Sequence, residues 1–123
     1  MKIILAEDND LLRKSLSFYL KSNGFEVDQF SNGKDALEAI KSNAFDMILT
    51  DINMPGISGM EITQYVRNGM KVNTPIIIFT SSNIEQTELD LFDLGANELI
   101  PKPVSPAVLL ARMNRLFKQA SLS

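Results

Sequence analysis

Five side chains suited to phosphoryl transfer each follow closely on a short apolar segment. They are Glu7, Asp8, Asp51, Thr80 and Lys102. Carboxylates that meet at one place raise each other's pKa unless a cation lies between them, and Mg²⁺ suits that position because it binds carboxylates, water and phosphate oxygens. With Glu7 and Asp8 holding the metal, Asp51 is free to accept a phosphoryl group covalently. These residue types predict phosphoryl transfer to Asp51, with Mg²⁺ as the cofactor and Mn²⁺ as its alternative.

The remaining two side chains fit the same chemistry. Phosphoryl transfer depends on positioning and charge neutralisation rather than on a general base, so a chain without His can carry it out. Lys102 would place a compact positive charge beside the transferred oxygens, and Thr80 would donate a hydrogen bond to one of them. Each residue alone is more commonly a helix cap, a turn residue or a surface charge. Their shared position beyond apolar segments favours one common site.

Apolar segments of strand length predict a parallel β-sheet that positions these groups. Four of them are nearly continuous and rich in apolar residues: 2–6, 47–50, 76–79 and 98–100. Such segments are typical of strands buried on both faces, whereas the alternating pattern of residues 25–30 indicates a strand near a sheet edge. Ligands bind at the carboxyl ends of such sheets. A strand order of 2-1-3-4-5 would bring Glu7, Asp8 and Asp51 together at the switch point between the first and third strands.

Helical patterns separate the strands. The first covers about residues 9–23 and stops at Gly24, a common helix terminator. The apolar positions of the first two helices are Leu11, Leu12, Leu16 and Leu20, and then Ala36, Leu37 and Ile40. Capping residues predict further helix starts: Asn32, Ser58, Ser82, and Ser105 before Pro106. The alternation predicts an α/β fold, a (βα)5 doubly wound three-layer sandwich.

Length and composition indicate one compact domain. The chain has 123 residues, of which 45% are hydrophobic and 22% charged, and a net charge of −3. It has no Cys, no basic run and no apolar stretch of membrane-spanning length, which argues against thiol sites, direct nucleic-acid binding and membrane insertion. With no secretion signal, the cytoplasm is the expected location. We assign residues 1–119 to the domain and expect residues 120–123 to be a frayed tail or the start of a linker.

Four stretches carry a family resemblance: LAEDN at residues 5–9, LTDINMPGISG at 49–59, PIIIFTSS at 75–82 and GANELIPKP at 95–103. In these stretches the chain resembles a response-regulator receiver domain, the CheY-like module of two-component signalling. The resemblance covers the whole chain. It implies the flavodoxin/CheY-like version of the predicted fold and a function as a signalling switch.

The resemblance also implies a role for each acidic residue. Asp51 would be the phosphoacceptor, modified to 4-aspartylphosphate. Glu7 and Asp8 would be the acidic pair, with Asp8 the closer metal ligand and Glu7 reaching the metal through water. The backbone carbonyl of Asn53 would complete the metal sphere.

Further residues match the switch of the family. Thr80 would be the switch hydroxyl, and the small Ser81 would leave phosphoryl access open. Lys102 would pair with the phosphoryl group and precede a cis peptide bond to Pro103. Leu99 stands where many members carry Tyr or Phe, an aromatic ring that rotates inward when the Thr moves. The usual aromatic coupling from Thr80 to the output face therefore cannot operate here.

The fourth helix has apolar residues on two sides. On a helical wheel Leu91 and Leu94 share one side, while Leu89 and Phe92 lie on another. We expect Phe92 and Leu99 to form part of a partner or dimer surface on the fourth helix, fifth strand and fifth helix. The alternative is that Phe92 merely covers a neighbouring helix.

The family's phosphoryl donor is a phosphohistidine, which this chain cannot supply because it has no His. The donor would be a histidine kinase, a His-phosphotransfer protein or a small phosphodonor. Phosphorylation would replace one negative charge on Asp51 with about two, and the mobile part would be residues 80–84 and the fourth helix. The expected outputs are binding of a downstream effector protein or domain and formation of a homodimer. The domain would not be an enzyme in the usual sense, because it would catalyse only its own phosphorylation and dephosphorylation.

Three other interpretations remain open. A docking-only receiver would bind partners without phosphorylation, although the full set of site residues speaks against it. A phosphatase of the haloacid-dehalogenase type would carry its nucleophile in an Asp-x-Asp pair after the first strand, whereas here Asp51 follows the third strand and is followed two residues later by Asn53. A flavodoxin-like module would need a phosphate-binding loop where Glu7 and Asp8 would repel the flavin phosphate.

Overall fold

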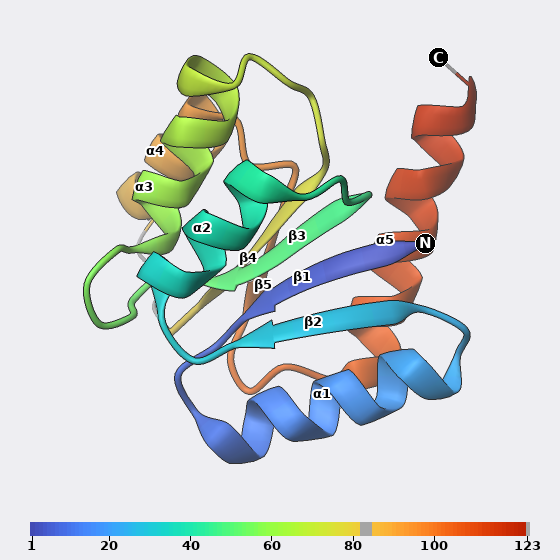
Figure 1. Cartoon of the computed structure of the whole chain (residues 1–123). Helices are drawn as coiled ribbons and strands as arrows, with labels where there is room; N and C mark the ends of the chain where they lie inside the picture. The colour runs from blue at the N-terminus through green and yellow to red at the C-terminus, as the bar shows by residue number, and fades with distance from the viewer. Residues whose placement is uncertain (82–84, 123) are drawn as a thin grey trace.

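Strands and helices alternate along the chain in a computed structural model that describes residues 1–81 and 85–122 (Figure 1). The elements are β1 (Lys2–Ala6), α1 (Asp10–Ser22), β2 (Glu26–Phe30), α2 (Gly33–Ser42), β3 (Met47–Asp51), α3 (Gly59–Gln64), the π-helical turn η1 (Tyr65–Gly69), β4 (Ile76–Thr80), α4 (Glu85–Leu94), β5 (Glu98–Pro101) and α5 (Pro106–Leu122). Within the described residues, the strands form one parallel sheet in the order β2-β1-β3-β4-β5. The predicted α/β class and strand order are confirmed.

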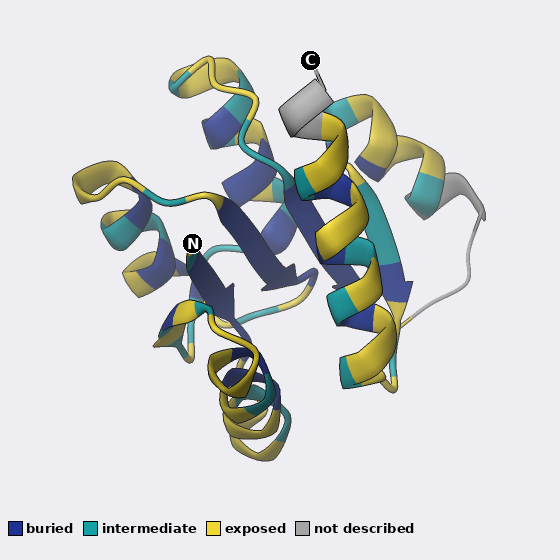
Figure 2. Ribbon diagram, turned by 90° about the vertical axis from the view of Figure 1, so that its right-hand side faces the viewer, coloured by how far each residue is buried: buried dark blue, intermediate teal, exposed yellow. Residues whose placement is uncertain are grey.

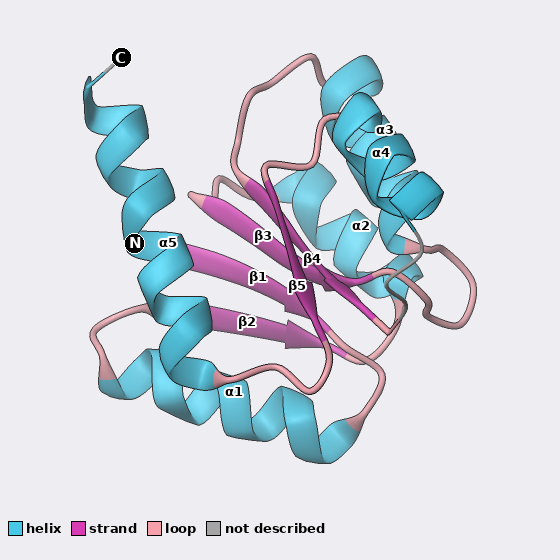
Figure 3. Ribbon diagram, turned by 180° about the vertical axis from the view of Figure 1, so that it is seen from behind, coloured by secondary structure: helices cyan, strands magenta, loops and turns pink. Residues whose placement is uncertain are grey.

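The sheet is the middle layer of a three-layer sandwich. α1 and α5 cover one face, and α2, α3 and α4 cover the other (Figure 3). Along β1, Ile3 and Leu5 pack with α1 and α5, while Ile4 and Ala6 pack on the opposite side, because successive side chains of a strand point to opposite faces. Every residue of β3 and β4 is buried, whereas the outer faces of the helices are exposed (Figure 2). Burial on both faces explains the continuous apolar segments.

β2 lies at the edge of the sheet, as its alternating pattern predicted. Val27 is buried in the core, while Glu26 and Gln29 are exposed. β1 and β3 are therefore neighbours near the centre of the sheet, and their carboxyl ends adjoin each other.

Most predicted helix ends are confirmed by their hydrogen bonds. The side chain of Asn32 accepts from the backbone N–H of the third residue after it at 2.8 Å, and Ser58 does the same at 3.2 Å. Ser105 caps α5 in the same way at 3.4 Å. Gly24 follows α1 with a φ of 92°, a conformation that favours glycine. The predicted start after Ser82 falls outside the described residues.

Some details differ from the sequence-based expectation. Leu11 is 81% exposed, whereas Leu16 and Leu20 are fully buried. At about 100° per residue, Leu11 lies about 140° around the helix from Leu16, so it does not face the sheet. Leu37 is only half-buried. The backbone of α5 continues to Leu122, and the domain boundary at residue 119, with a frayed tail or linker after it, stays a prediction.

No helix in the described part of the chain combines the length and the apolar character needed to cross a bilayer.

Candidate functional site

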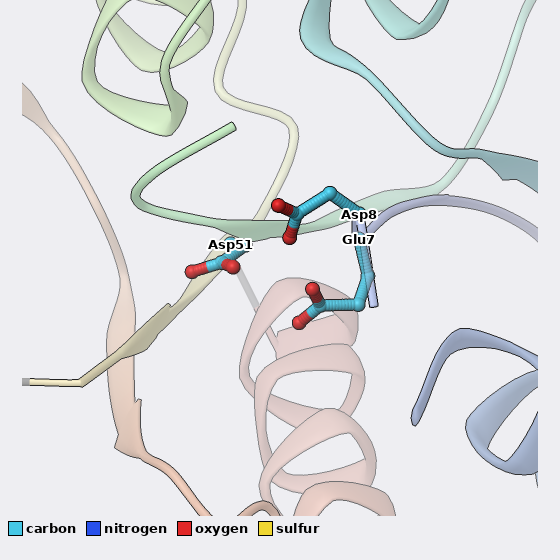
Figure 4. Close-up of side chains that lie close together, drawn as sticks. All are labelled: Glu7, Asp8 and Asp51. Atoms are coloured by element: carbon cyan, nitrogen blue, oxygen red, sulfur yellow. The ribbon is translucent and has the colours of Figure 1, made fainter. Parts of the chain in front are cut away.

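Three acidic residues meet at the carboxyl ends of β1 and β3. Glu7 and Asp8 directly follow β1, and Asp51 is the last residue of β3. Figure 4 shows their carboxylates turned toward one another from these two segments. One carboxylate oxygen from each residue lies within 4.8 Å of the others. The parallel register of β1 and β3 thus produces the cluster that the sequence predicted.

Glu7 is the buried member of the cluster, with no exposed surface. Its Oε2 accepts a hydrogen bond from the backbone N–H of Asn9 at 3.0 Å, and its Oε1 lies 2.9 Å from Nζ of Lys102. This second contact is an ion pair without hydrogen-bond alignment, so Oε1 is a buried acceptor without a hydrogen-bond donor. Burial raises the pKa of Glu7, as do Asp8 and Asp51, while Asn9 and Lys102 partly offset the rise. A further positive charge nearby would therefore stabilise the ionised carboxylate of Glu7.

Lys102 connects two carboxylates of the cluster. Its Nζ donates to Oδ2 of Asp51 at 2.7 Å and lies 2.9 Å from Oε1 of Glu7. Burial lowers the pKa of Lys102, but its hydrogen bond to Asp51 and the negative charges of Asp51 and Glu7 outweigh this effect and raise the pKa above its ordinary value. The backbone N–H of Lys102 donates to the carbonyl of Thr80 at 2.7 Å, and the peptide bond to Pro103 is cis, as predicted. The side chain of Lys102 is therefore a positively charged ammonium in contact with the acidic cluster.

Asp51 and Asp8 differ in their surroundings. Asp51 is buried, and besides Lys102 it accepts a long contact of 3.4 Å at Oδ1 from the backbone N–H of Asn53. Asp8 and Asn53 are exposed. Oxygen ligands of this kind, open to solvent on one side, fit a hard divalent cation such as Mg²⁺. The orphaned Oε1 of Glu7 and the short distances within the cluster support the same fit.

Thr80 and Ser81 lie at the end of β4, the strand next to β3. Thr80 is buried and pairs in register with Pro101, just before Lys102. Ser81 is exposed. The structure thus places Thr80 beside the strand that carries Asp51. Of the predicted mobile loop 80–84, residues 82–84 lie outside the described residues.

The predicted partner residues Phe92 and Leu99 occupy different environments. On α4, Leu91 is fully buried, whereas Leu89 is 52% and Phe92 48% exposed. The expected division of the helix into two sides is therefore present, and Phe92 is on the exposed side. Leu99 is half-buried and packs against the core cluster beneath α2, α3 and α4. Phe92 therefore exposes apolar surface to solvent, and a smaller fraction of Leu99 is exposed.

Sequence reasoning missed one contact at the site. Arg13 donates from Nη1 to the backbone carbonyl of Glu7 at 3.0 Å and forms an ion pair with Asp10 at 2.8 Å. The spacing of Asp10 and Arg13 is a recognisable helical ion pair. No local signal indicates the contact with Glu7, because this contact depends on the orientation of α1 relative to the end of β1.

Comparisons with known proteins agree with this geometry. The family model of the response regulator receiver domain matches residues 3–114. The chain is 32% identical over 120 residues to the transcriptional regulatory protein ResD of Bacillus subtilis, covering 98% of this chain and 49% of ResD. It thus spans about half the length of this curated relative.

Two solved structures show the same fold. The chemotaxis response regulator CheY4 of Vibrio cholerae superposes with a TM-score of 0.86 at 30% identity, covering 93% of this chain and 96% of that one. The BeF3-activated receiver domain of DrrB gives a TM-score of 0.85 at 30% identity, covering 95% and 97%. The family match over residues 3–114 and these two structures show that the chain belongs to the response regulator receiver domains of two-component systems, a family of phosphorylation-based switches.

Proposed function

We propose that this domain is a switch that accepts a phosphoryl group on Asp51 from a partner phosphohistidine. The observation that carries the proposal is the position of Lys102, whose Nζ lies 2.7 Å from Asp51 and 2.9 Å from Glu7 within the acidic cluster. A structural ion pair would need one carboxylate, whereas this arrangement gathers three with a single ammonium. Such a site neutralises the charge of an incoming phosphoryl group at a carboxylate nucleophile.

Each residue has a role in this proposal. A carboxylate oxygen of Asp51 attacks phosphorus while the bond from phosphorus to the donor imidazole breaks, so the imidazole leaves as the new acyl phosphate forms. Lys102 stabilises the negative charge of the transferred oxygens. Thr80 donates its hydroxyl to one of them after transfer, and the small exposed Ser81 leaves the approach open.

The cofactor in this proposal is Mg²⁺, with Mn²⁺ as its alternative. Asp8, Asp51 and the backbone carbonyl of Asn53 would hold the ion, with Glu7 acting through water. Bound there, it would supply the positive charge that allows a phosphoryl group to approach a carboxylate cluster. Glu7 suits the outer position because its oxygens already face Asn9 and Lys102.

Partners and location follow from the same proposal. The donor is a histidine kinase or a His-phosphotransfer protein, and the output is binding to a downstream effector protein or domain. The domain acts only on itself and has no substrate that it turns over. Because ResD is a transcriptional regulatory protein, we propose an effector that acts on transcription and a cytoplasmic location.

The decisive test is the intact mass of the protein after incubation with acetyl phosphate and Mg²⁺. We expect a single phosphoryl adduct in the wild type, lost in Asp51→Asn and without Mg²⁺. Asp28→Asn, which changes a carboxylate paired with Lys2 outside the cluster, should keep the adduct. No adduct in the wild type, together with no binding of beryllium fluoride by NMR, would instead support a docking-only receiver.

The exposed side of α4 favours a second copy of this chain as a partner. Leu89 and Phe92 provide apolar surface there. The sequence of α4 contains four acidic residues and no basic one, whereas α5 has basic residues and no acidic one. A two-fold related pair of copies would place the acidic α4 of one against α5 of the other, where Arg112 and Arg115 remain partly exposed beside Glu98.

Phe92→Ala is expected to weaken self-association of the beryllium fluoride-treated domain by about tenfold, the effect of losing one aromatic anchor. Sedimentation velocity over a concentration series measures this dissociation constant. Phe18→Ala, which removes an exposed Phe from α1, is the matched control and should leave association unchanged. Unaltered association in Phe92→Ala, or an equal loss in the control, would exclude this surface.

A further inference from the structure

We infer that Gly33, the first residue of α2, is a positioning residue for the loop that presents Asn53 beside Asp51. This loop comprises residues 52–58, between β3 and α3, and we call it the β3–α3 loop. The inference rests on the proposed function, because the position of Asn53 affects phosphorylation only if its carbonyl helps to hold Mg²⁺. Gly33 itself touches neither the carboxylates nor the metal position.

Gly33 is required by a close approach between two backbone segments. A Cβ atom at this position would lie 1.8 Å from the carbonyl oxygen of Ile57, 2.6 Å from its carbonyl carbon and 2.9 Å from its Cβ. Real Cβ atoms essentially never lie closer than 3.0 Å to such atoms, so α2 or the loop would have to shift by more than 1 Å. The nearest atoms belong to the backbone and cannot rotate away as a flexible side chain would. Any residue larger than glycine at this position therefore displaces Ile57 relative to α2.

The start of the β3–α3 loop is hydrogen-bonded to β4, and the residue after its end is hydrogen-bonded back to the start of the loop. The backbone N–H of Ile52 donates to the carbonyl of Phe79 at 3.0 Å, and that of Gly59 donates to the carbonyl of Ile52 at 2.9 Å. A Cβ at Gly59 would lie 2.5 Å from the carbonyl oxygen of Asp51, so this end is also closely packed. A displacement of Ile57 cannot be absorbed at these ends. Where the loop rather than α2 shifts, residues 53–58 take up the displacement.

Asn53 is the first residue of that segment and the one closest to the cluster. Its backbone N–H reaches Oδ1 of Asp51 at 3.4 Å, which is already at the long limit of a hydrogen bond. A shift of the segment would change the direction of its peptide groups relative to Asp51. Groups that orient metal ligands from outside the coordination sphere commonly change metal affinity by about 10–100-fold when altered. Gly33 thus couples the packing of α2 to the affinity for Mg²⁺.

The first variant that tests this inference is Gly33→Ala. We expect its dissociation constant for Mg²⁺, measured by NMR titration of the isotope-labelled chain, to rise about tenfold. Gly69→Ala is the matched control, because the nearest atoms to its Cβ would be those of the Tyr65 ring on η1, at 3.1 Å and beyond. It should retain the wild-type dissociation constant. A change in unfolding midpoint alone, without a change in Mg²⁺ affinity, would show that Gly33 has only a structural role.

A second variant keeps the test decisive if Gly33→Ala does not fold. Ile57→Ala retains the backbone but removes the half-buried side chain by which the loop packs on the core. We expect weaker Mg²⁺ binding here too, whereas Leu110→Ala, a similarly half-buried position on the other face of the sheet, should lose only stability. Wild-type Mg²⁺ affinity in Ile57→Ala, or in folded Gly33→Ala, would overturn this inference but leave the proposed function intact. Failure of the wild-type chain to bind Mg²⁺ would overturn the proposed function and this inference with it.

Discussion

Replacing Lys102 by Met is expected to slow phosphorylation of Asp51 by acetyl phosphate about 100-fold or more, even at saturating Mg²⁺. Met keeps most of the length of the side chain but removes the ammonium that lies 2.7 Å from Asp51 and 2.9 Å from Glu7. The incoming phosphoryl oxygens would then meet the cluster without that positive charge. The buried carboxylate of Glu7 would also lose its cation, which favours a still higher pKa for Glu7. Initial rates of adduct formation by intact mass measure the effect.

Two controls separate the charge of Lys102 from other effects. Lys118→Met removes an exposed Lys from α5 and should leave the rate unchanged. Lys102→Arg keeps a positive charge with a different shape, so it should retain more activity than Lys102→Met. A phosphorylation rate for Lys102→Met close to that of the wild type would show that Lys102 has only a structural role, as a partner in ion pairs, and does not act in phosphoryl transfer.

Phe79→Ala is expected to lower the free energy of unfolding by about 3–5 kcal/mol. Phe79 is a fully buried side chain on β4 and belongs to the core cluster beneath α1 and α5. Truncation would leave a cavity in a layer whose neighbours come from several elements and cannot all collapse into it. Because domains of this size are stable by only about 5–15 kcal/mol, the loss is a large share of the total. Equilibrium unfolding in urea, followed by circular dichroism, measures it.

The control for this prediction removes the same atoms from a different environment. Phe18 on α1 is 74% exposed, so Phe18→Ala should change the free energy of unfolding by less than about 1 kcal/mol. Phe79→Leu, which refills much of the volume, should lose less than Phe79→Ala. If Phe79→Ala unfolded at the same urea concentration as Phe18→Ala, the core around β4 would be less closely packed than the structure indicates.

The strands and most helix ends could be predicted because their signals are local. Segments such as residues 47–49 and 76–79 are apolar throughout and are buried throughout. Asn32, Ser58 and Ser105 each cap the helix that follows them. Each cap is a contact within three residues along the chain, and each strand carries its signal in its continuous apolar composition, so the local sequence pattern carries enough information.

The proximity of the site residues could also be predicted, from the expected strand order of the sheet rather than from contacts between neighbouring residues. Polar residues at the carboxyl ends of parallel strands must lie at the same edge of the sheet. With β1 next to β3, Glu7 and Asp8 necessarily approach Asp51. The roles of these residues in phosphoryl transfer stay predictions until the adduct on Asp51 is measured.

Sequence by itself therefore indicated the alternation of strands and helices, the strand order and the gathering of the three carboxylates. Only the tertiary structure decided that Leu11 faces solvent, that Glu7 is wholly buried, and that one ammonium from Lys102 contacts two carboxylates. The contact of Gly33 with Ile57 belongs to the same group. These features depend on the exact separation and rotation of elements distant in sequence. Packing sets such distances to within an ångström, and no local pattern of residue types records them.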